Sequence, residues 1–326
     1  MGIQDSLNYA SRGLRGCIAN IPYLGLPYAV QIEITTKCNL RCEMCYRSKE
    51  QVGAVNSDMS LDFFNSIVSR LRYPARHVTL VGLGEPLLHP QLFSIIRSAK
   101  ERGLLVSLIS NFTLLDRDKS LSLINSGLDF LFVSFDSSTK SVFEKIRTGA
   151  CFEEIIDNVK LFVKTKEEVK AKTPLFFFKS TVSRRNSEEI RQLIHLAESL
   201  GVEGIDFGKL FGEEDEYIHD PSCFLNMEEF KGSKIIIDPC EIGKSYQCDG
   251  IAGCYITFDG KVLPCGIMMQ AIYRSDYSKY ELGDLNTDTI DKIWRSDKFK
   301  QFRKQIKSHS RPYLPVCEEC PAWMYE

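Results

Sequence analysis

Short apolar runs alternate with amphipathic stretches from residue 29 to about residue 210. The apolar runs predict strands at residues 29–35, 77–83, 104–109, 130–135, 175–182 and 204–207. The stretches between them repeat apolar residues at helical spacing and predict helices at residues 61–71, 91–102, 119–125, 140–145, 152–166 and 187–200. The strands are nearly continuous apolar runs, which is typical of strands buried on both faces. This alternation predicts an α/β fold of about six β/α units on a parallel sheet, and a closed barrel, a partial barrel and an open sheet all satisfy it.

The regular pattern stops after residue 210. Residues 211–247 carry an acidic run at 213–216 and few periodic apolar positions, so we interpret them as a linker or a lid, with a solvated loop as the simpler alternative. Residues 248–326 form a second, cysteine-rich unit, and residues 1–28 are an N-terminal extension. Within the cysteine-rich unit, Asp259-Gly260 separates two short strand-like runs and predicts a hairpin turn, and helices are predicted at 289–294 and 299–307.

Composition narrows the class of protein. The 326 residues are 44% hydrophobic and 26% charged with a net charge of −2, which is typical of a folded globular chain. There is no basic excess and no run of about 18 apolar residues, so we expect neither a nucleic-acid partner nor a membrane span. The first 30 residues lack the pattern of a secretory signal peptide, so we expect a cytoplasmic protein. In that reducing compartment its 12 cysteines more often bind metal or do chemistry than form disulfides.

Three cysteines cluster directly after the first predicted strand. Cys38, Cys42 and Cys45 have the spacing C-x3-C-x2-C. In β/α folds the loops that follow the strands build active sites. Three thiolates on one loop can hold three corners of a [4Fe–4S] cluster and leave the fourth iron open, which a catalytic metal centre needs. The alternative is a zinc knuckle, which requires a fourth protein ligand, and no His lies within 30 residues of Cys38.

Further motifs follow the later predicted strands. They are Gly82-Leu83-Gly84-Glu85-Pro86, Ser110-Asn111-Phe112-Thr113, Val133-Ser134-Phe135-Asp136 and Arg147-Thr148-Gly149. Together with the three cysteines and the aromatic Tyr46 that follows them, these motifs resemble those of the radical S-adenosylmethionine (radical SAM) superfamily. Leu83 and Phe112 each stand where that family has a glycine. The resemblance covers residues 29–210 and implies a partial (β/α)6 barrel in which the motifs meet at one mouth.

The resemblance also implies a mechanism. The methionine group of S-adenosylmethionine binds the open iron of a cluster held by Cys38, Cys42 and Cys45. The reduced cluster donates an electron, and the resulting 5′-deoxyadenosyl radical abstracts a hydrogen atom from the substrate. A reducing flavodoxin or ferredoxin is the implied electron donor.

A set of residues is implied to contact S-adenosylmethionine, namely Tyr46, Gly84, Glu85, Asn111, Ser134, Asp136 and Arg147. Gly84 lets the backbone approach the methionine, Glu85 accepts hydrogen bonds from its ammonium, and Arg147 binds its carboxylate. Asn111 and Asp136 either reach the ribose hydroxyls or support the cysteine loop. Structural alternatives stand beside these roles, since Gly84 can form a simple turn, Asp136 can cap a helix and Arg147 can lie at the surface.

A second group of cysteines lies toward the C-terminus, namely Cys248, Cys254, Cys265, Cys317 and Cys320. The run 260–265, the segments 282–285 and 293–294 and the final C-x2-C pair resemble the SPASM/twitch extension of radical SAM enzymes. This resemblance implies one auxiliary [4Fe–4S] cluster on Cys248, Cys265, Cys317 and Cys320. Cys254 is a fifth candidate that either replaces Cys248 or stays free. By spacing alone a structural zinc ribbon fits equally well.

An auxiliary cluster can accept an electron from a substrate radical in this family. The implied function is therefore the oxidation or related modification of a small molecule, a sugar or a cofactor precursor. The alternative substrate is a peptide or protein, which would gain a thioether, a C–C crosslink or an oxidised side chain. In some relatives that oxidise a side chain, an Asp base follows the auxiliary cysteine, whereas Gly266 follows Cys265 here. An alternative of another class is a non-catalytic, zinc-stabilised binding protein, and no catalytic residue is assigned.

Overall fold

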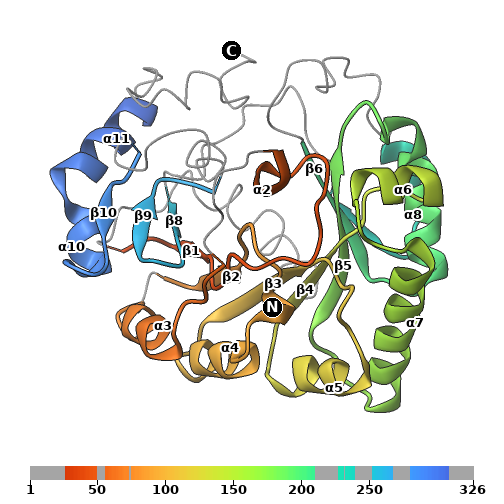
Figure 1. Cartoon of the computed structure of the whole chain (residues 1–326), viewed down its shortest axis with the longest axis horizontal. Coiled ribbons are helices and arrows are strands. Elements are labelled where there is room, and N and C mark those ends of the chain that lie inside the picture. Colours follow the sequence, from red (N-terminus) through yellow and green to blue (C-terminus); the bar gives the residue numbers. More distant parts are fainter. Residues whose placement is uncertain are drawn as a thin grey trace. The chain divides into compact units, whose positions relative to one another are not determined.

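The computed structural model describes residues 26–49, 56–72, 75–209, 227–230, 232–238, 252–266 and 280–307 (Figure 1). Packing divides the chain into two compact units. Residues 1–37, 50–107 and 244–326 belong to the first, and residues 38–49 and 108–243 belong to the second. Each unit combines helices with parallel strands, so the predicted α/β class is confirmed. None of the helices in the described ranges has the length and apolar character that crossing a membrane requires.

The sheet of the first unit has the strand order β10-β9-β8-β1-β2. These strands are β1 (Ala29–Ile32), β2 (His77–Leu80), β8 (Gly253–Ile256), β9 (Lys261–Leu263) and β10 (Gly283–Asp284). β1 is parallel to β2 and β8, whereas β9 is antiparallel to β8 and β10. The predicted C-terminal hairpin is therefore present, and it extends the sheet that contains the first strand of the β/α region.

The helices of the first unit are α3 (Leu61–Val68), α4 (Leu92–Glu101), α10 (Ile290–Arg295) and α11 (Asp297–Lys307), with a 3-10 turn, η2, at Pro86–Leu88. α3 begins where its sequence predicts, because the Ser60 hydroxyl accepts a hydrogen bond from the Phe63 N–H at 3.2 Å. Trp294 of α10 packs on Phe299 of α11 with ring centroids 4.6 Å apart. The guanidinium of Arg303 lies 4.3 Å from the Trp294 ring, which adds a cation–π contact to this helix pair.

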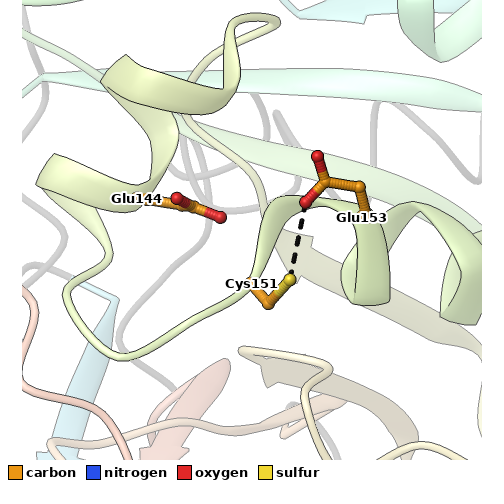
Figure 2. A group of neighbouring side chains, drawn as sticks. All are labelled: Glu144, Cys151 and Glu153. Atoms are coloured by element: carbon orange, nitrogen blue, oxygen red, sulfur yellow. Dashed lines mark hydrogen bonds between the residues drawn. The ribbon is translucent and has the colours of Figure 1, made fainter.

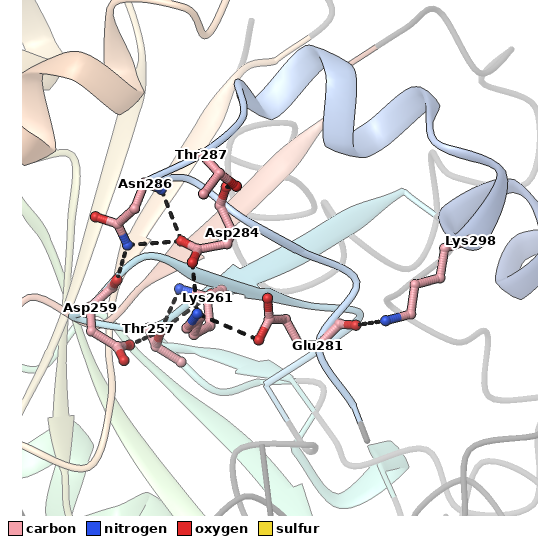
Figure 3. Close-up of polar contacts among 8 residues, drawn as sticks. All are labelled: Thr257, Asp259, Lys261, Glu281, Asp284, Asn286, Thr287 and Lys298. Atoms are coloured by element: carbon pink, nitrogen blue, oxygen red, sulfur yellow. Dashed lines mark hydrogen bonds and ion pairs between the residues drawn. The ribbon is translucent and has the colours of Figure 1, made fainter. Parts of the chain in front are cut away.

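A polar network stabilises the C-terminal hairpin and joins it to β10 (Figure 3). Gly260 has a φ of 92°, which the Asp-Gly turn between β8 and β9 requires. Lys261 Nζ on β9 donates to Asp284 Oδ2 on β10 at 2.7 Å, and Asn286 Nδ2 donates to the Asp259 carbonyl at 2.7 Å. These bonds fix the hairpin that contains Cys254 and leads into Cys265.

The second unit contains the parallel strands β4 (Phe130–Ser134), β5 (Leu175–Val182), β6 (Gly204–Lys209) and β7 (Ile236–Asp238), in that order. The strand β3 (Leu105–Ser110) leads into this unit from the first. Its helices are α2 (Tyr46–Lys49), α5 (Arg117–Asn125), α6 (Lys140–Ile146), α7 (Phe152–Glu168) and α8 (Ile190–Ser199), with 3-10 turns η3 at Ser187–Glu189 and η6 at Met227–Phe230.

Three residues of the segment that we interpreted as a linker or lid form a strand. β7 pairs with β6, with Ile236 opposite Gly204 and Asp238 opposite Asp206. A run of three residues carries too little periodicity to be recognised as a strand. The predicted helices at 140–145 and 152–166 are separate, as α6 and α7, and Gly149 has a φ of 98° between them.

Aromatic packing identifies the face of β5 that meets the helices. Phe176 packs against Phe162 of α7 with ring centroids 4.8 Å apart. Phe178 stacks on Phe135 at 4.5 Å, and Phe135 in turn contacts Phe143 of α6 at 4.8 Å. Figure 1 shows α7 and α8 along this side of β5 and β6. This face of the sheet is therefore the apolar core of the second unit.

The other face of β5 carries the alternate residues Phe177, Lys179 and Thr181, because successive side chains of a strand point to opposite sides. Phe177 stacks there on Phe132 of β4, with ring centroids 5.3 Å apart. This face, which we call the face opposite α7, becomes polar toward the C-terminal ends of the strands.

Candidate functional site

The three clustered cysteines lie on one loop of the second unit, just before α2. The Cys45 N–H donates to the Cys42 carbonyl at 3.0 Å, which closes a turn within the loop. The Arg41 N–H donates to the Thr148 carbonyl at 3.0 Å, and the Glu43 N–H donates to the Ile146 carbonyl at 2.9 Å. The backbone of the cysteine loop is thus bonded directly to the segment that follows α6.

Asn111, after β3, supports the start of this loop. Its Nδ2 lies 4.0 Å from Cys38 Sγ and donates to Asn39 Oδ1 at 3.0 Å. Asn39 Nδ2 donates to Thr113 Oγ1 at 2.7 Å, and the Thr113 N–H donates back to Asn111 Oδ1 at 3.0 Å. The intervening Phe112 is buried with a φ of 64°, although a glycine is expected at that position. These contacts favour the loop-supporting role that the sequence left open for Asn111.

Arg147 and Asp136 form a buried ion pair beside the second cysteine. Arg147 Nε donates to Asp136 Oδ2 at 2.5 Å, and its Nη1 lies 3.9 Å from Cys42 Sγ. Burial disfavours the guanidinium charge, but Asp136 and Cys42 outweigh that effect and raise the pKa of Arg147. Arg147 is therefore a fixed positive charge at the cysteine loop, and it is not a surface residue.

Asp136 is held from two further directions. Its Oδ1 accepts the Thr181 N–H at 2.7 Å, near the end of β5. Its carbonyl accepts a hydrogen bond from Asn186 Nδ2 at 2.7 Å, and Asn186 also donates to the Thr181 carbonyl at 2.9 Å. The sequence analysis missed Asn186, whose signal is a polar residue in the turn between β5 and η3. These bonds fix Asp136 as a support for Arg147.

The donor set of the loop fits an iron–sulfur cluster. Cys42 is buried, and Cys38 and Cys45 are half-buried. Burial raises the pKa of the Cys45 thiol, so its thiolate depends on nearby positive charge. Arg147 supplies one such charge, and iron supplies more when it is bound. Three thiols on one loop, with a cation and an amide beside them, are the ligand chemistry of a [4Fe–4S] cluster that keeps one iron open.

Gly84 and Glu85 lie in the first unit, in the loop after β2. A Cβ on Gly84 would lie 2.2 Å from the Thr35 carbonyl oxygen and 2.8 Å from that of Lys37, so only glycine fits. The Glu85 N–H donates to the Lys37 carbonyl at 2.7 Å, and Glu85 Oε1 accepts the Leu87 N–H at 2.9 Å at the start of η2. The loop is thus bonded to the residue that immediately precedes Cys38 in the chain.

The two remaining residues of the cofactor set are placed less fully. Ser134 is the last residue of β4, half-buried and opposite Lys179 of β5. Tyr46 begins α2, and its side chain lies outside the described part of the chain. The contacts of both residues with S-adenosylmethionine stay predictions.

Of the second cysteine group, Cys254 and Cys265 are described, whereas Cys248, Cys317 and Cys320 lie outside the described residues. Cys254 is buried in β8, and its burial raises the pKa of its thiol to about 12, although the nearby Arg303 acts to lower it. Cys265 is half-buried and follows β9. The two described cysteines therefore have different environments.

Cys254 and the chain that follows Cys265 lie on different sides of the sheet. Cys254 and its neighbour Tyr255 point to opposite faces of β8. Tyr255 is opposite Gln31 of β1. Gly266, next to Cys265, lies against this pair, because a Cβ there would be 2.2 Å from Gln31 Oε1 and 3.6 Å from the Tyr255 ring. The chain after Cys265 therefore lies on the Tyr255 side, whereas Cys254 lies on the Arg303 side.

Glu33, directly after β1, is a buried carboxyl group that the sequence analysis missed. Its Oε1 accepts the Leu83 N–H at 3.0 Å, and its Oε2 lies 3.5 Å from the Phe258 N–H of the C-terminal hairpin. A Cβ on Gly82 would lie 2.5 Å from Glu33 Cγ, so the glycine makes room for this side chain. Burial raises the pKa of Glu33 to about 7, against the lowering effect of these hydrogen bonds. The signal was a single acidic residue within an apolar strand.

One further group of possible metal ligands occurs in the described ranges (Figure 2). One ligand atom from each of Glu144, Cys151 and Glu153 lies within 4.8 Å of the others. Glu144 Oε1 accepts the Phe152 N–H at 3.0 Å at the start of α7, and both Glu153 oxygens accept from Lys140 Nζ at 2.9 Å. These carboxylates already have partners that satisfy a helix end and an ion pair, so we assign no metal to them.

Two family profiles match the chain. The profile of the radical SAM superfamily matches residues 32–179, and that of an iron–sulfur cluster-binding domain named SPASM matches residues 248–321. The two matches contain both cysteine groups identified from the sequence.

Two curated relatives match along most of their length. The chain is 26% identical to the tungsten-containing aldehyde ferredoxin oxidoreductase cofactor-modifying protein of Pyrococcus furiosus, over 89% of this chain and 86% of that protein. It is 25% identical to the AdoMet-dependent heme synthase of Methanosarcina barkeri, over 92% of each chain. Among solved structures, SuiB of Streptococcus suis bound to its precursor peptide SuiA superimposes with a TM-score of 0.69 at 13% identity, covering 98% of this chain and 74% of that one. This last likeness concerns the fold.

Proposed function

The chain belongs to the radical SAM superfamily and carries a C-terminal SPASM-type iron–sulfur domain, and we propose that it modifies a small molecule or cofactor precursor by hydrogen abstraction. The single observation that carries this proposal is the loop of Cys38, Cys42 and Cys45. Its thiols share one turn, with Arg147 3.9 Å from Cys42 Sγ and Asn111 4.0 Å from Cys38 Sγ. The chain is thus an enzyme whose own residues form a site for an iron–sulfur cluster.

These residues have distinct roles in the proposal. Cys38, Cys42 and Cys45 hold a [4Fe–4S] cluster, which, when bound, supplies the electron that cleaves S-adenosylmethionine to methionine and a 5′-deoxyadenosyl radical. Arg147 offsets the negative charge of the thiolates and, through Asp136, is held by the backbone of β5. Gly84 and Glu85 bind the methionine group, with Ser134 as a further donor. A reduced flavodoxin or ferredoxin of the cytoplasm is the proposed electron donor.

The substrate class rests on the relatives that match over most of their length. A cofactor-modifying protein and a heme synthase both align with about nine-tenths of this chain, which includes the C-terminal region. A peptide is the second candidate, because a PqqA peptide cyclase of Rhodopseudomonas palustris is 31% identical over 37% of the chain. That match is shorter, so we favour a small molecule or cofactor precursor.

The C-terminal unit holds one auxiliary [4Fe–4S] cluster in this proposal, with Cys248, Cys265, Cys317 and Cys320 as ligands. Cys254 is left out, because it is a buried thiol on the Arg303 side of the sheet. These ligand cysteines would hold an auxiliary cluster, which could supply an acceptor for an electron from a substrate radical.

Iron and sulfide analysis of anaerobically reconstituted protein tests the proposal. The wild-type protein is compared with a Cys38→Ala/Cys42→Ala/Cys45→Ala variant, and 5′-deoxyadenosine formation from S-adenosylmethionine is measured after reduction by dithionite. We expect about eight irons per chain in the wild type and about four in the variant, with 5′-deoxyadenosine formed by the wild type alone.

Other outcomes separate the two parts of the proposal. About four irons in the wild type and none in the variant would retain the radical chemistry and remove the auxiliary cluster. No 5′-deoxyadenosine from iron-loaded wild-type protein would overturn the proposed function. Deuterium transferred to 5′-deoxyadenosine from a labelled peptide, and not from labelled small molecules, would establish the second candidate instead.

A further inference from the structure

Lys179 and Asp206 form an ion pair on the face of the sheet opposite α7. Lys179 Nζ donates to Asp206 Oδ2 at 2.6 Å. The two residues are directly opposite each other on the parallel strands β5 and β6, and Ser134 of β4 is opposite Lys179 on its other side. A polar row therefore crosses three strands on the face that does not contact the helical core.

The ammonium of Lys179 faces an open position. Gly208 of β6 is opposite Thr181 of β5, two residues further along each strand than the Lys179–Asp206 pair. An ideal Cβ on Gly208 would lie 4.0 Å from Lys179 Nζ and 3.9 Å from the Ser180 carbonyl oxygen, and apart from its chain neighbours no atom of the described residues would be closer. A ligand atom can thus occupy the place of the missing side chain within reach of the ammonium.

Lys179 also has donors to offer. An ammonium carries three N–H groups. Within the described ranges, Lys179 Nζ donates to Asp206. About a third of the Lys179 side chain, 33%, is exposed, although it lies well inside a strand. Asp206 holds the ammonium in place, and the remaining donors point to no protein acceptor among those residues.

The open position at Gly208 lies beside Thr181, the β5 residue that helps to hold the cysteine loop in place. Thr181, opposite Gly208, donates its N–H to Asp136, which binds Arg147 beside Cys42. Lys179 precedes Thr181 by two residues, which is about 7 Å along a strand. A group bound over Gly208 would therefore lie next to the support of the proposed cluster site.

A second Lys–carboxylate ion pair in the same unit has a structural role and can be compared with the Lys179–Asp206 pair. Lys166 Nζ of α7 donates to Glu203 Oε2 at 2.6 Å, and the same oxygen accepts the Phe176 N–H at 2.7 Å. This pair joins a helix to the start of β5, and only 11% of the Lys166 side chain is exposed. The Lys179–Asp206 pair, by contrast, joins two strands that are already paired through their backbones, and the Lys179 side chain is more exposed than that of Lys166.

We propose that Lys179, oriented by Asp206, binds an acidic group of the substrate, a carboxylate or a phosphate, over Gly208. The inference rests on the proposed function and adds the substrate class to it. The ammonium gives a charge-assisted hydrogen bond, and the glycine gives the acid room to approach. Such an anchor would hold the substrate next to the support of the cysteine loop.

Protection of Lys179 from chemical labelling tests the inference on the full-length, reconstituted protein. The protein is treated with a limiting dose of acetic anhydride at constant ionic strength, and acetylation of each lysine is quantified by mass spectrometry. The probes are inorganic phosphate, succinate and the uncharged succinamide. We expect phosphate or succinate to reduce acetylation of Lys179 by about tenfold at saturation, with no change at Lys166 and no effect of succinamide. Protection by phosphate alone indicates a phosphorylated substrate, and protection by succinate alone indicates a carboxylic acid.

Gly208→Val supplies the second measurement, because its side chain fills the position within reach of Lys179 Nζ and leaves both charged residues of the ion pair in the chain. Gly208→Ala is the milder companion, since its Cβ makes only ordinary contacts. We expect Gly208→Val to abolish the anion protection of Lys179. Equal acetylation of wild-type Lys179 with and without both anions, or equal protection in Gly208→Val, overturns the inference. Formation of 5′-deoxyadenosine by the same wild-type preparation is scored separately, so a failure of the proposed function is distinguishable from a failure of this anchor.

Discussion

Arg147 connects Asp136 to Cys42, since its Nε lies 2.5 Å from Asp136 Oδ2 and its Nη1 lies 3.9 Å from Cys42 Sγ. Asp136 is fully buried and also accepts the Thr181 N–H. The end of β5 thereby positions a cation next to a cysteine that is distant in sequence. The electrostatic environment of the cysteines therefore depends on residues that the sheet holds in place as well as on the loop itself.

Removing the cation from this pair should destabilise the protein. Arg147→Met leaves Asp136 as a buried, unpaired carboxylate, which should lower the free energy of unfolding by about 3 to 5 kcal/mol. Arg147→Met/Asp136→Asn should regain part of that loss, because the amide is neutral and still accepts the Thr181 N–H. Urea unfolding measures both, and iron content after reconstitution should stay low in both variants because the cation is missing.

A matched control is Arg185→Met, which removes the ion pair between Arg185 and Glu43 of the same cysteine loop. Both side chains of this pair are more exposed than those of Arg147 and Asp136. It should change the free energy of unfolding by no more than about 1 kcal/mol. Equal stability of Arg147→Met and Arg185→Met would contradict the importance assigned to the buried pair.

Gly84 should not tolerate even the smallest side chain. A Cβ at this position would lie 2.2 Å from the Thr35 carbonyl oxygen, and backbone atoms cannot move aside cheaply. We expect Gly84→Ala to lower the free energy of unfolding by about 1 to 3 kcal/mol, as overpacking does. Gly232→Ala is the control, because no other part of the described chain lies within 4 Å of a Cβ there. Identical urea midpoints for the two variants would show that the loop after β2 is not packed in this way.

Local signals in the sequence predicted the regular elements well. β5 has the bounds expected from its apolar run at 175–182, and α3 begins after the Ser60 cap. The Asp259-Gly260 turn forms the expected hairpin. These features depend on residues close in sequence, so periodicity and turn chemistry suffice to find them.

Long-range pairing was harder to foresee. The sequence contains no local sign that β8 pairs with β1, because the two strands are separated by more than two hundred residues. The same holds for the bond between Thr181 and Asp136, which depends on how strand ends meet. The motif residues were therefore identifiable, whereas their partners, and with them the loop-supporting contacts of Asn111 and Asp136, required the fold.

The buried carboxyl of Glu33 should make stability depend on pH. Its pKa is raised from 4.5 to about 7 by burial, so the folded chain holds a proton that the unfolded chain has already lost between these values. The contribution of Glu33 to the free energy of unfolding is complete below pH 4.5. It falls by about 3 kcal/mol as the pH rises to about 7. Thermal unfolding between pH 5 and pH 8 measures this contribution as the difference between the wild type and a variant that cannot ionise at this position.

Glu33→Gln provides the comparison, because the amide resembles the protonated acid and cannot ionise. The difference in melting temperature between the variant and the wild type should grow as the pH rises from 5 to 8. Parallel pH profiles for the two proteins would show that Glu33 does not titrate in this range. Burial lowers the pKa of His77 to about 4, whereas the unfolded chain protonates it below about pH 6.5, so His77 makes the stability of both proteins rise with pH over part of this range. This contribution is common to the wild type and the variant, so it cancels in their difference.

The two described cysteines of the C-terminal unit should respond differently to substitution. In the Cys38→Ala/Cys42→Ala/Cys45→Ala background, all remaining iron reports the auxiliary cluster. Cys265→Ala should reduce that iron from about four per chain to nearly none, because Cys265 is a proposed ligand. Cys254→Ala should retain it, since the pKa of this thiol is raised to about 12 and its side chain lies on the Arg303 side, away from the chain that follows Cys265. Loss of iron in Cys254→Ala with retention in Cys265→Ala would reverse the assignment and make Cys254 the ligand that the hairpin supplies.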